Sequence, residues 1–294
     1  MCWLCDFKST SNPTNTPQAA PRWQARRGFL LAAGAAVAGG ASAQVDVGAA
    51  SGMRKLVPAE TLENNALQQY KQVLAEAQAQ NALAPNGHPQ LVRLHAIAKR
   101  LIPYTQSWNP RAKEWRWQVN LIGSKQLNAW CMPGGKIAFY SGILDQLKLN
   151  DDEVAMIMGH EMAHALREHA RERLSKNMAT EGLSRLGGAV AAMAFGIDPR
   201  VTDMIARGGA NLLTLKFSRD DETEADLVGL EIAARAGYRP EASVALWRKM
   251  LAANGSGGAP WLSTHPSGAN RIHELEANLP KVQRLYEQAR RGAG

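Results

Sequence analysis

The pattern of apolar and polar positions predicts a mainly helical chain with a short β-region near its middle. Apolar residues recur at helical spacing over residues 60–81 and 89–102. Residues 115–122 alternate between apolar and polar, as strands do, and residues 127–140 have the pattern of a hairpin turned at Pro133-Gly134-Gly135. We therefore expect an α+β fold, predominantly α-helical, with a small β-sheet or hairpin beside a central helix.

The second half of the chain also has helical periodicity. We expect one helix from Glu222 to about Ala236, ending at Gly237, and another over residues 241–253. Residues 178–209 are rich in Gly and Ala and weakly amphipathic, so they form either one or two helices folded over a cleft or ordinary core packing. A Gly-rich loop over residues 254–259 and two short terminal helices complete the expected order.

The central helix has a clear start signal. Asn150 and Glu153 have the spacing of a capping box, and Asp151 and Asp152 place negative charge in the first turn, where the helix dipole favours it. An apolar stripe follows at helical spacing, formed by Val154, Ile157, Met158, Ala165 and Leu166. A charged stretch follows that stripe, formed by Arg167, Glu168, Arg171, Glu172 and Arg173. We therefore expect the middle of this helix to be mostly buried.

Inside this helix, residues 160–164 read His-Glu-Met-Ala-His. Histidines four residues apart lie on one helix face, so the imidazoles of His160 and His164 can bind one zinc ion. Glu161 lies beside them and can take a proton from an attacking water. A solvated helix face with two incidental histidines would give the same motif. Burial of the helix disfavours that interpretation, because an unpaired imidazole is costly to bury.

A catalytic zinc site usually has three protein ligands. The extended motif H-E-x-x-H-x-x-G-x-x-H would supply a third histidine, but Arg167 and Ala170 occupy its Gly and His positions. His169 is one position off this spacing and is expected to point away from the zinc face. The third ligand is therefore expected from a second helix.

That second helix carries Ser-Arg-Asp-Asp-Glu-Thr-Glu-Ala-Asp at residues 218–226. Glu222 and Asp226 are four residues apart and share one helix face. Glu222 can be the third ligand, and Asp226 can accept the free ring N–H of a zinc-binding histidine. Glu224 lies about 200° around the helix from Glu222, so only one of these two glutamates can face the metal.

These motifs, in this order and spacing, resemble the zinc metallopeptidase family of the CAAX prenyl proteases, HtpX and Oma-type proteases. The chain has H-E-x-x-H at residues 160–164, S-R-x-x-E-x-E-A-D at residues 218–226 and Thr-His-Pro at residues 264–266. Residues 128–137 also resemble the family's N-A-x-x-x-P-G-G strand pair. The resemblance covers roughly residues 91–279.

The resemblance implies a zincin-type metalloprotease domain with one zinc ion per chain, held by His160, His164 and Glu222, and with Glu161 as general base. His265 would approach the metal from a loop, and two roles stay open: stabilising the tetrahedral intermediate or capping the zinc in a resting state. A histidine that merely satisfies a loop–helix junction is a third interpretation. Arg271 would face the same cleft as a clamp for a carbonyl or carboxylate group.

The amino terminus has the features of an export signal. Arg26 and Arg27 precede an apolar run over residues 29–39, and Ala41-Ser42-Ala43 forms a small-residue cleavage site before Gln44. This apolar run is too short to span a bilayer. The paired arginines resemble a twin-arginine signal, and an ordinary secretory signal is the alternative. We therefore expect a periplasmic mature protein, free or peripheral to a membrane.

Removal of residues 1–43 leaves 30 Lys and Arg against 25 Asp and Glu, a net charge of +5 with no concentrated run, which disfavours nucleic-acid binding. Cys131 is the one cysteine left, so no intramolecular disulfide is expected. No other stretch has the length and apolarity of a membrane span. After the signal peptide we expect a helical lead-in at residues 44–90, a metalloprotease domain at 91–280, and a C-terminal helix and tail at 281–294.

The predicted function is a zinc-dependent metalloendopeptidase of the cell envelope, acting in quality control of unfolded or misassembled proteins. Its polypeptide substrate would pair as an added strand along an edge strand formed by Lys136, Ile137, Ala138 and Phe139. The alternative is a latent protease that acts mainly as a chaperone-like binding protein, with His265 closing the zinc site.

Overall fold

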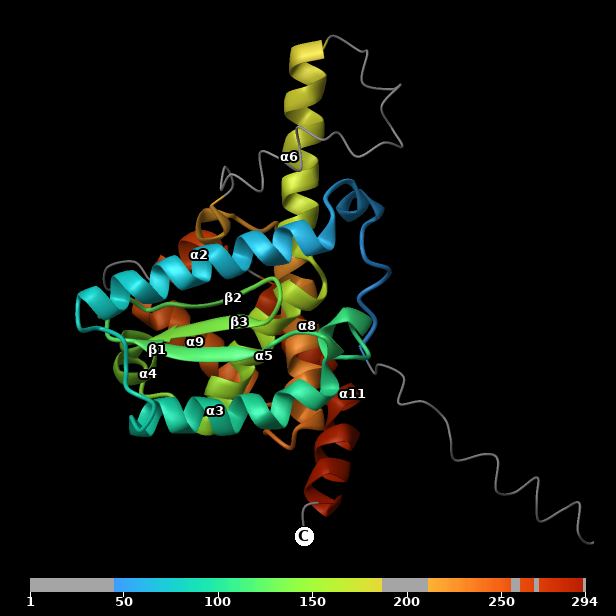
Figure 1. Ribbon diagram of the computed structural model, residues 1–294. Helices are drawn as coiled ribbons and strands as arrows, with labels where there is room; N and C mark the ends of the chain where they lie inside the picture. Colours follow the sequence, from blue (N-terminus) through green and yellow to red (C-terminus); the bar gives the residue numbers. More distant parts are fainter. Residues whose placement is uncertain (1–44, 187–210, 255–259, 267–269, 293–294) are drawn as a thin grey trace, which may run out of the picture. The chain divides into compact units, whose positions relative to one another are not determined.

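Strand β3 (Lys136–Tyr140) is the central strand of a three-stranded sheet in the computed structural model (Figure 1). It pairs in parallel with β1 (Gln118–Ile122) and antiparallel with β2 (Ala129–Met132). The predicted hairpin is confirmed, because β2 and β3 are joined by a turn in which Gly134 and Gly135 have φ angles of 81° and 72°. Glycine adopts this left-handed backbone conformation without steric cost, which explains the two glycines in the turn.

The structure describes residues 45–186, 211–254, 260–266 and 270–292, all within one compact unit that runs from Ala43 to Gly294. The predicted export signal lies outside the described residues. So does most of the predicted helical segment at residues 178–209, of which the first part continues a helix that begins at His169.

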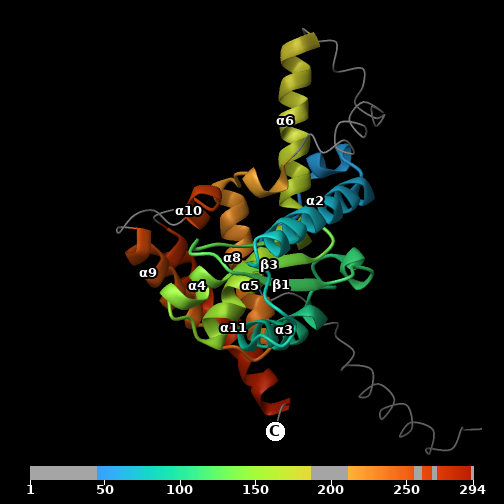
Figure 2. The same cartoon turned by 60° about the vertical axis from the view of Figure 1, so that its left-hand side comes forward.

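Most of the described helices match those expected from the sequence, but the helix at Ser141–Gln146 and the start of a helix at His169 were not expected. They are α2 (Ala59–Ala79), α3 (Pro89–Leu101), α4 (Ser141–Gln146), α5 (Asp151–Leu166), α6 (His169–Leu186), α8 (Arg219–Arg235), α9 (Ala242–Asn254), α10 (Pro260–Thr264) and α11 (Arg271–Gly292). Short 3-10 helices occur at Gly52–Leu56, Ile102–Tyr104, Pro110–Lys113 and Leu212–Thr214. Helix α6 projects away from the sheet, whereas α10 lies beside α8 and α9 (Figure 2).

The end of the chain differs from the sequence prediction. Instead of two short terminal helices, the five-residue α10 is followed by the single long helix α11, which continues through Pro280. A proline normally ends or kinks a helix, and this preference favoured the shorter elements. No helix therefore begins at residue 281.

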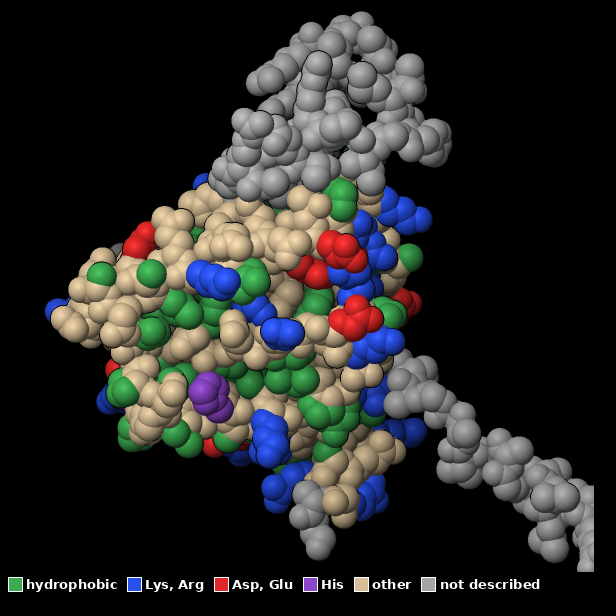
Figure 3. Space-filling model, in the orientation of Figure 1, with side chains coloured by type: hydrophobic (Ala, Val, Ile, Leu, Met, Phe, Trp, Pro, Cys, Tyr) green, Lys and Arg blue, Asp and Glu red, His purple; other side chains and the backbone are tan. Residues whose placement is uncertain are grey.

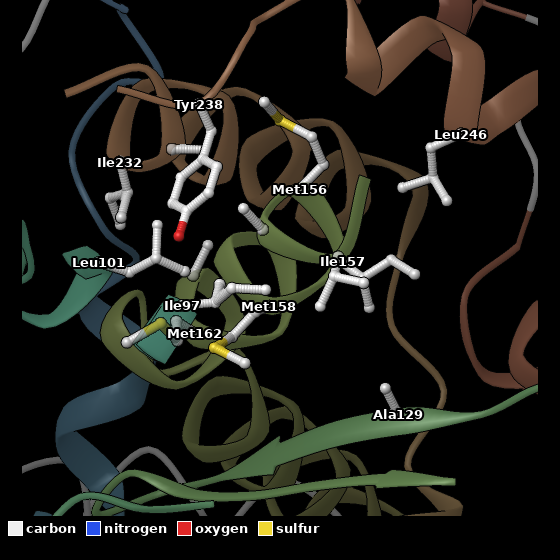
Figure 4. Close-up of a cluster of buried hydrophobic side chains, with 14 of the residues drawn as sticks. Ile97, Leu101, Ala129, Met156, Ile157, Met158, Met162, Ile232, Tyr238 and Leu246 are labelled. Carbon is white, nitrogen blue, oxygen red and sulfur yellow. The ribbon is translucent and has the colours of Figure 1, made fainter. Parts of the chain in front are cut away.

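Helices pack on both faces of the sheet. Alternate residues of a strand point to opposite faces, and Ile137 and Phe139 of β3 join the main core while Ala138 joins a second cluster with Tyr70 of α2. The main core fills the space among the sheet, α3, α5, α8 and α9. Figure 4 shows part of this core, in which α5 packs among residues of α3, α8 and β2 through Met156, Ile157, Met158 and Met162.

Helix α5 is the buried centre of the domain, as expected. Both hydrogen bonds of its capping box form: Asn150 N donates to Glu153 Oε2 at 2.9 Å, and Glu153 N donates to Asn150 Oδ1 at 3.0 Å. Every residue from Glu153 to Leu166 is buried. Helix α8 has a second capping box, formed by Ser218 and Asp221. The two helices cross at glycines, since a β-carbon on Gly159 would lie 2.8 Å from the carbonyl oxygen of Gly229.

Among the described helices, none combines the length and apolarity needed to cross a membrane. On the face shown in Figure 3, Lys and Arg side chains are spread over the surface, with Asp and Glu side chains among those at the right edge. This mixed distribution is that of an ordinary solvated surface.

Candidate metal centre

His160 and His164 lie one turn apart on α5, and their Nε2 atoms are 3.1 Å from each other. Both side chains are buried, with 4% and 3% of their surface exposed. Burial, together with the neighbouring His160, holds the pKa of His164 well below its ordinary value. The neutral imidazole that results is the form that binds a metal ion.

Glu222 and His265 complete the cluster. Glu222 extends from α8 and places Oε1 3.4 Å from His164 Nε2 and Oε2 3.6 Å from His160 Nε2. Nδ1 of His265 lies 3.1 Å from Glu222 Oε1 and 3.3 Å from His160 Nε2. One donor atom from each of the four residues lies within 4.8 Å of all the others. Imidazole and carboxylate donors that converge in this way fit a zinc-type metal ion.

Asp226 orients His160 from one turn further along α8. Its Oδ1 lies 3.0 Å from His160 Nδ1, which leaves Nε2 of that ring directed at the cluster. Burial alone would raise the pKa of Asp226, but the Arg271 guanidinium and the His160 ring bring it down to about 2. Asp226 is therefore an ionised acceptor beside His160.

Arg271 clamps carboxylates that belong to the chain itself. Its Nε and Nη2 donate to the two oxygens of Asp226 at 2.6 and 2.7 Å, and its Nη1 donates to Glu222 Oε2 at 2.6 Å. The guanidinium also lies 3.7 Å from the ring centre of Trp247. Burial lowers the pKa of Arg271, but Asp226 and Glu222 outweigh that effect and raise it. Arg271, expected to clamp a carbonyl or carboxylate group in the cleft, thus supports Glu222, one of the four donors of the candidate centre.

Glu161 lies beside the cluster but is engaged by two other side chains. Its Oε1 accepts a hydrogen bond from Trp261 Nε1 at 2.8 Å and lies 3.6 Å from His265 Nε2. Trp261 and His265 stack with ring centres 4.6 Å apart and an angle of 21° between their planes. Burial lowers the pKa of His265, but the carboxylates of Glu161 and Glu222 raise it above its ordinary value. Sequence reasoning missed Trp261, whose position four residues before His265 was the available signal.

The sequence analysis expected His169 to point away from the metal-binding face, and His169 is not among the four donors of the cluster, although it contacts His164. Its Nδ1 lies 2.8 Å from His164 Nδ1. The prediction assumed one continuous helix, whereas α5 ends at Leu166 and Glu168 has a φ of 61°, so that His169 begins α6 in a new direction. Phe217 stacks on the His164 ring, with ring centres 4.0 Å apart.

Glu224 faces away from the metal-binding atoms, as its position on the helix predicted. Its Oε2 lies 3.3 Å from His169 Nε2, and its Oε1 is paired with Arg167. Both partners are buried, although the sequence analysis assigned neither to the site.

The edge strand beside the site is β2, so the prediction that Lys136, Ile137, Ala138 and Phe139 form a free edge was wrong. Those residues belong to β3, whose backbone pairs with a strand on both sides, because β1 joins it in parallel. In the described part of the chain, β2 pairs on one side alone. A pocket runs along β2 and reaches the metal centre; it is lined by residues that include Trp130, Met132, Leu213, Leu215, Phe217, Glu161, His164 and His265.

Comparison with known proteins agrees with this arrangement. Residues 90–279 match peptidase family M48. The chain is 32% identical to the mitochondrial metalloendopeptidase OMA1 of Schizosaccharomyces pombe over 216 residues. The aligned region covers 73% of this chain and 60% of that protein. It is 24% identical over 156 residues to metalloprotease YcaL of Escherichia coli, covering 53% of this chain and 59% of YcaL.

A third relative is the beta-barrel assembly-enhancing protease of Escherichia coli O157:H7, which is 28% identical over 177 residues that cover 58% of this chain and 36% of that protein. The chain thus spans about three-fifths of the length of the OMA1 relative. The resemblance to Oma-type proteases is confirmed, and the fold has the expected mostly helical organisation with a small sheet. The chain belongs to peptidase family M48.

Proposed function

We propose that this protein is a zinc-dependent endopeptidase. The observation that carries the proposal is the buried convergence of His160, His164 and Glu222, with Glu161 placed next to them. Zinc would be held by these two imidazoles and this carboxylate, and it would lower the pKa of water and polarise the scissile carbonyl. The alternative is a zinc site with a purely structural role, but such a site needs no carboxylate in the position of Glu161.

Glu161 serves as the general base and then as the general acid in this proposal. It takes the proton of the attacking water and transfers it to the leaving amine of the cleaved peptide bond. Asp226 and Arg271 hold His160 and Glu222 in place, so that these ligands need no rearrangement during turnover.

The substrate would bind as an extended strand along β2. An unpaired strand edge offers backbone donors and acceptors to a peptide, and this recognition depends little on the substrate's side chains. The apolar pocket beside β2 adds a preference for a large apolar side chain near the cleaved bond, because Trp130, Leu213 and Leu215 line it. Such segments are exposed in unfolded proteins and buried in folded ones.

The segment that carries Trp261 and His265 acts as a gate. In this structure His265 offers a nitrogen to the cluster, and Trp261 donates a hydrogen bond to Oε1 of Glu161. Both contacts would hinder catalysis, which supports a gating role for this segment. The segment must move before a water molecule and a substrate carbonyl can occupy the site.

A role in envelope protein quality control is part of the proposal. Its support is the export signal predicted from the sequence and the similarity to bacterial proteases such as YcaL and the beta-barrel assembly-enhancing protease. A purely chaperone-like activity gains no support from the geometry, because Glu161 has no function in it.

The direct test is casein cleavage by the purified protein, compared with a Glu161→Gln variant. The variant should retain one zinc ion per chain and lose proteolysis, since Gln cannot transfer the proton. A variant that cleaves as well as the wild type would refute the assigned chemistry. Comparing the envelope proteomes of cells that carry the wild type or this variant would then identify natural substrates.

A further inference from the structure

The apolar part of the pocket beside β2 belongs to the second hydrophobic cluster. The pocket residues in this cluster are Trp130, Met132, Ala170, Leu212, Leu213 and Leu215. Helix α2 adds Leu62, Ala66 and Tyr70 to the same cluster and lies along the sheet beside β2 (Figure 1). Among the described residues that line the pocket, none comes from α2. The pocket is therefore supported by a helix that does not line it.

One side of the pocket is formed by Leu212, Leu213 and Leu215, the pocket wall. This wall begins with the short 3-10 helix Leu212–Thr214, which Asn211 caps by accepting a hydrogen bond from Leu213 N at 3.0 Å. A single 3-10 turn has few hydrogen bonds of its own. The position of the wall therefore depends on contacts with neighbouring elements.

Gln69 of α2 makes such a contact with the first residue of the wall. Its Oε1 accepts a hydrogen bond from Leu212 N at 3.0 Å. Its Nε2 donates to Asn65 Oδ1 at 2.6 Å, one turn earlier on α2, so both ends of the amide are used and its orientation is defined. Leu212 is buried, and a buried backbone N–H without an acceptor is costly. The hydrogen bond to Gln69 thus ties the wall to α2.

We propose that Gln69 determines the preference of the pocket for a large apolar substrate residue by holding Leu212 in place. Gln69 is a positioning residue, because it acts through the wall and does not itself line the pocket. The residues that match peptidase family M48 begin at residue 90, so this support comes from outside the matched region. The inference rests on the proposed function, since it assumes that the pocket receives a substrate side chain.

Two substitutions separate the hydrogen bond from the bulk of the side chain. Gln69→Met keeps the approximate length and removes the acceptor, whereas Gln69→Glu keeps an oxygen that can accept from Leu212. Gln72→Met is the matched control, because Gln72 lies on the same helix and donates to Glu76 at 3.0 Å on the exposed surface. Thermal unfolding reports whether each variant folds. Zinc affinity should be unchanged in all three, and a loss confined to Gln69→Met would move the effect to the metal centre and overturn the proposal.

The first measurement is peptide binding without turnover. Each variant is combined with Glu161→Gln and loaded with zinc, and fluorescence anisotropy gives the Kd of two labelled peptides that share one polar sequence and carry Leu or Ala at the centre. The Glu161→Gln parent should bind the Leu peptide more tightly, by roughly tenfold or more. Gln69→Met should reduce this preference by about 2–10-fold, whereas Gln69→Glu and Gln72→Met should retain it.

Three results of the binding measurement would overturn the inference. The first is a parent that binds both peptides equally. The second is a folded Gln69→Met protein with the full preference for Leu, or one that loses affinity for both peptides by the same factor, as a merely structural role predicts. The third is an equal loss of preference in Gln69→Met and Gln69→Glu, because the accepting oxygen would then not matter.

The second measurement is cleavage of the same two peptides by the proteins that retain Glu161. Gln69→Met should lower the ratio of kcat/KM for the Leu peptide to that for the Ala peptide, through a higher KM for the Leu peptide and with little change in kcat. A wild type that binds the Leu peptide preferentially and cleaves neither would count against the proposed function alone. Cleavage with an unchanged ratio in Gln69→Met would overturn this inference alone.

Discussion

Gly159 of α5 and Gly229 of α8 meet where the two helices cross, and a β-carbon on Gly229 would lie 2.6 Å from the backbone nitrogen of His160. No other residue type fits at this crossing without moving one helix. The contact sets the separation between the helix that carries the two histidines and the helix that carries Glu222. The geometry of the candidate metal centre therefore depends on a pair of glycines that are not among its four donor residues.

Replacing Gly229 with Ala should force the two helices apart. We expect the free energy of unfolding to fall by about 1–3 kcal/mol and zinc affinity to fall with it. Urea unfolding and chelator competition measure the two effects. Gly87→Ala is the matched control, because a β-carbon there would meet nothing within 4 Å, and its effect should stay within about 0.5 kcal/mol. Unchanged zinc affinity in Gly229→Ala would contradict the role assigned to the crossing.

The metal-binding carboxylate and its supporting neighbour should differ in importance. Glu222→Gln removes a charged ligand and should strongly weaken zinc binding, and His160→Ala or His164→Ala should abolish both binding and proteolysis. Asp226→Asn should have an intermediate effect, a loss of about 10–100-fold in affinity. Metal analysis and chelator competition give the ranking. A wild-type protein that neither contains nor takes up zinc would remove the basis of the enzyme proposal.

His265→Ala tests the gate. Loss of the imidazole should open the metal site and raise casein cleavage, by about tenfold if the closed arrangement is favoured by ~1.4 kcal/mol. Trp261→Phe keeps an aromatic ring but loses the hydrogen bond to Glu161, so it should raise cleavage as well. A sharp fall in His265→Ala, on the order of 10²–10³-fold in kcat, would instead assign His265 to stabilising the oxyanion.

Tyr70 should make the fold sensitive to high pH. Its hydroxyl donates to Ile137 O at 3.3 Å and accepts from Asn120 Nδ2 at 2.6 Å, and burial raises its pKa from 10.0 to about 12. Because the folded-state pKa is raised, the stabilisation is complete below pH 10 and is lost as the pH rises from about 10 to about 12. The loss amounts to about 2–3 kcal/mol.

Urea unfolding between pH 8 and pH 11.5 measures this dependence on alkaline pH. Tyr70→Phe should be less stable at pH 8, by about 1 kcal/mol for the lost hydrogen bond. Its stability should then decline less steeply than that of the wild type. Parallel curves for the two proteins would exclude Tyr70 as the source of the alkaline sensitivity.

Features that depend on neighbouring residues could be predicted from the sequence. The capping box at Asn150, the glycine turn before β3 and the pair of histidines on α5 each follow from short-range geometry, and the structure contains all of them. Glu222 and Asp226 could be chosen because helical spacing places them on one face. Their meeting with α5 could not be derived from spacing alone; it was inferred from the need for a third ligand and supported by the family resemblance.

Features that depend on strand order and chain direction could not be predicted. Alternation of apolar and polar residues identifies a strand but does not determine which strand pairs with it. The parallel pairing of β1 with β3 was therefore not predicted, and the free edge was assigned to β3 instead of β2. The left-handed φ of Glu168 has no strong sequence signal, since glycine or asparagine is the usual residue there. Because of the conformation of this one residue, the contact between His169 and His164 could not be predicted.

The separation of the metal-binding residues along the chain has a consequence for the timing of folding. His160 and His265 are 105 positions apart, and Asp226 lies 66 positions from His160. Contacts between such distant residues form late, because the entropy of closing a long loop must be overcome before the contact stabilises anything. A growing or partly folded chain therefore lacks a complete centre until α8 has docked on α5. Under the proposed function, a newly made molecule gains hydrolytic capacity only after these distant contacts have formed, so unfinished copies cannot cleave one another.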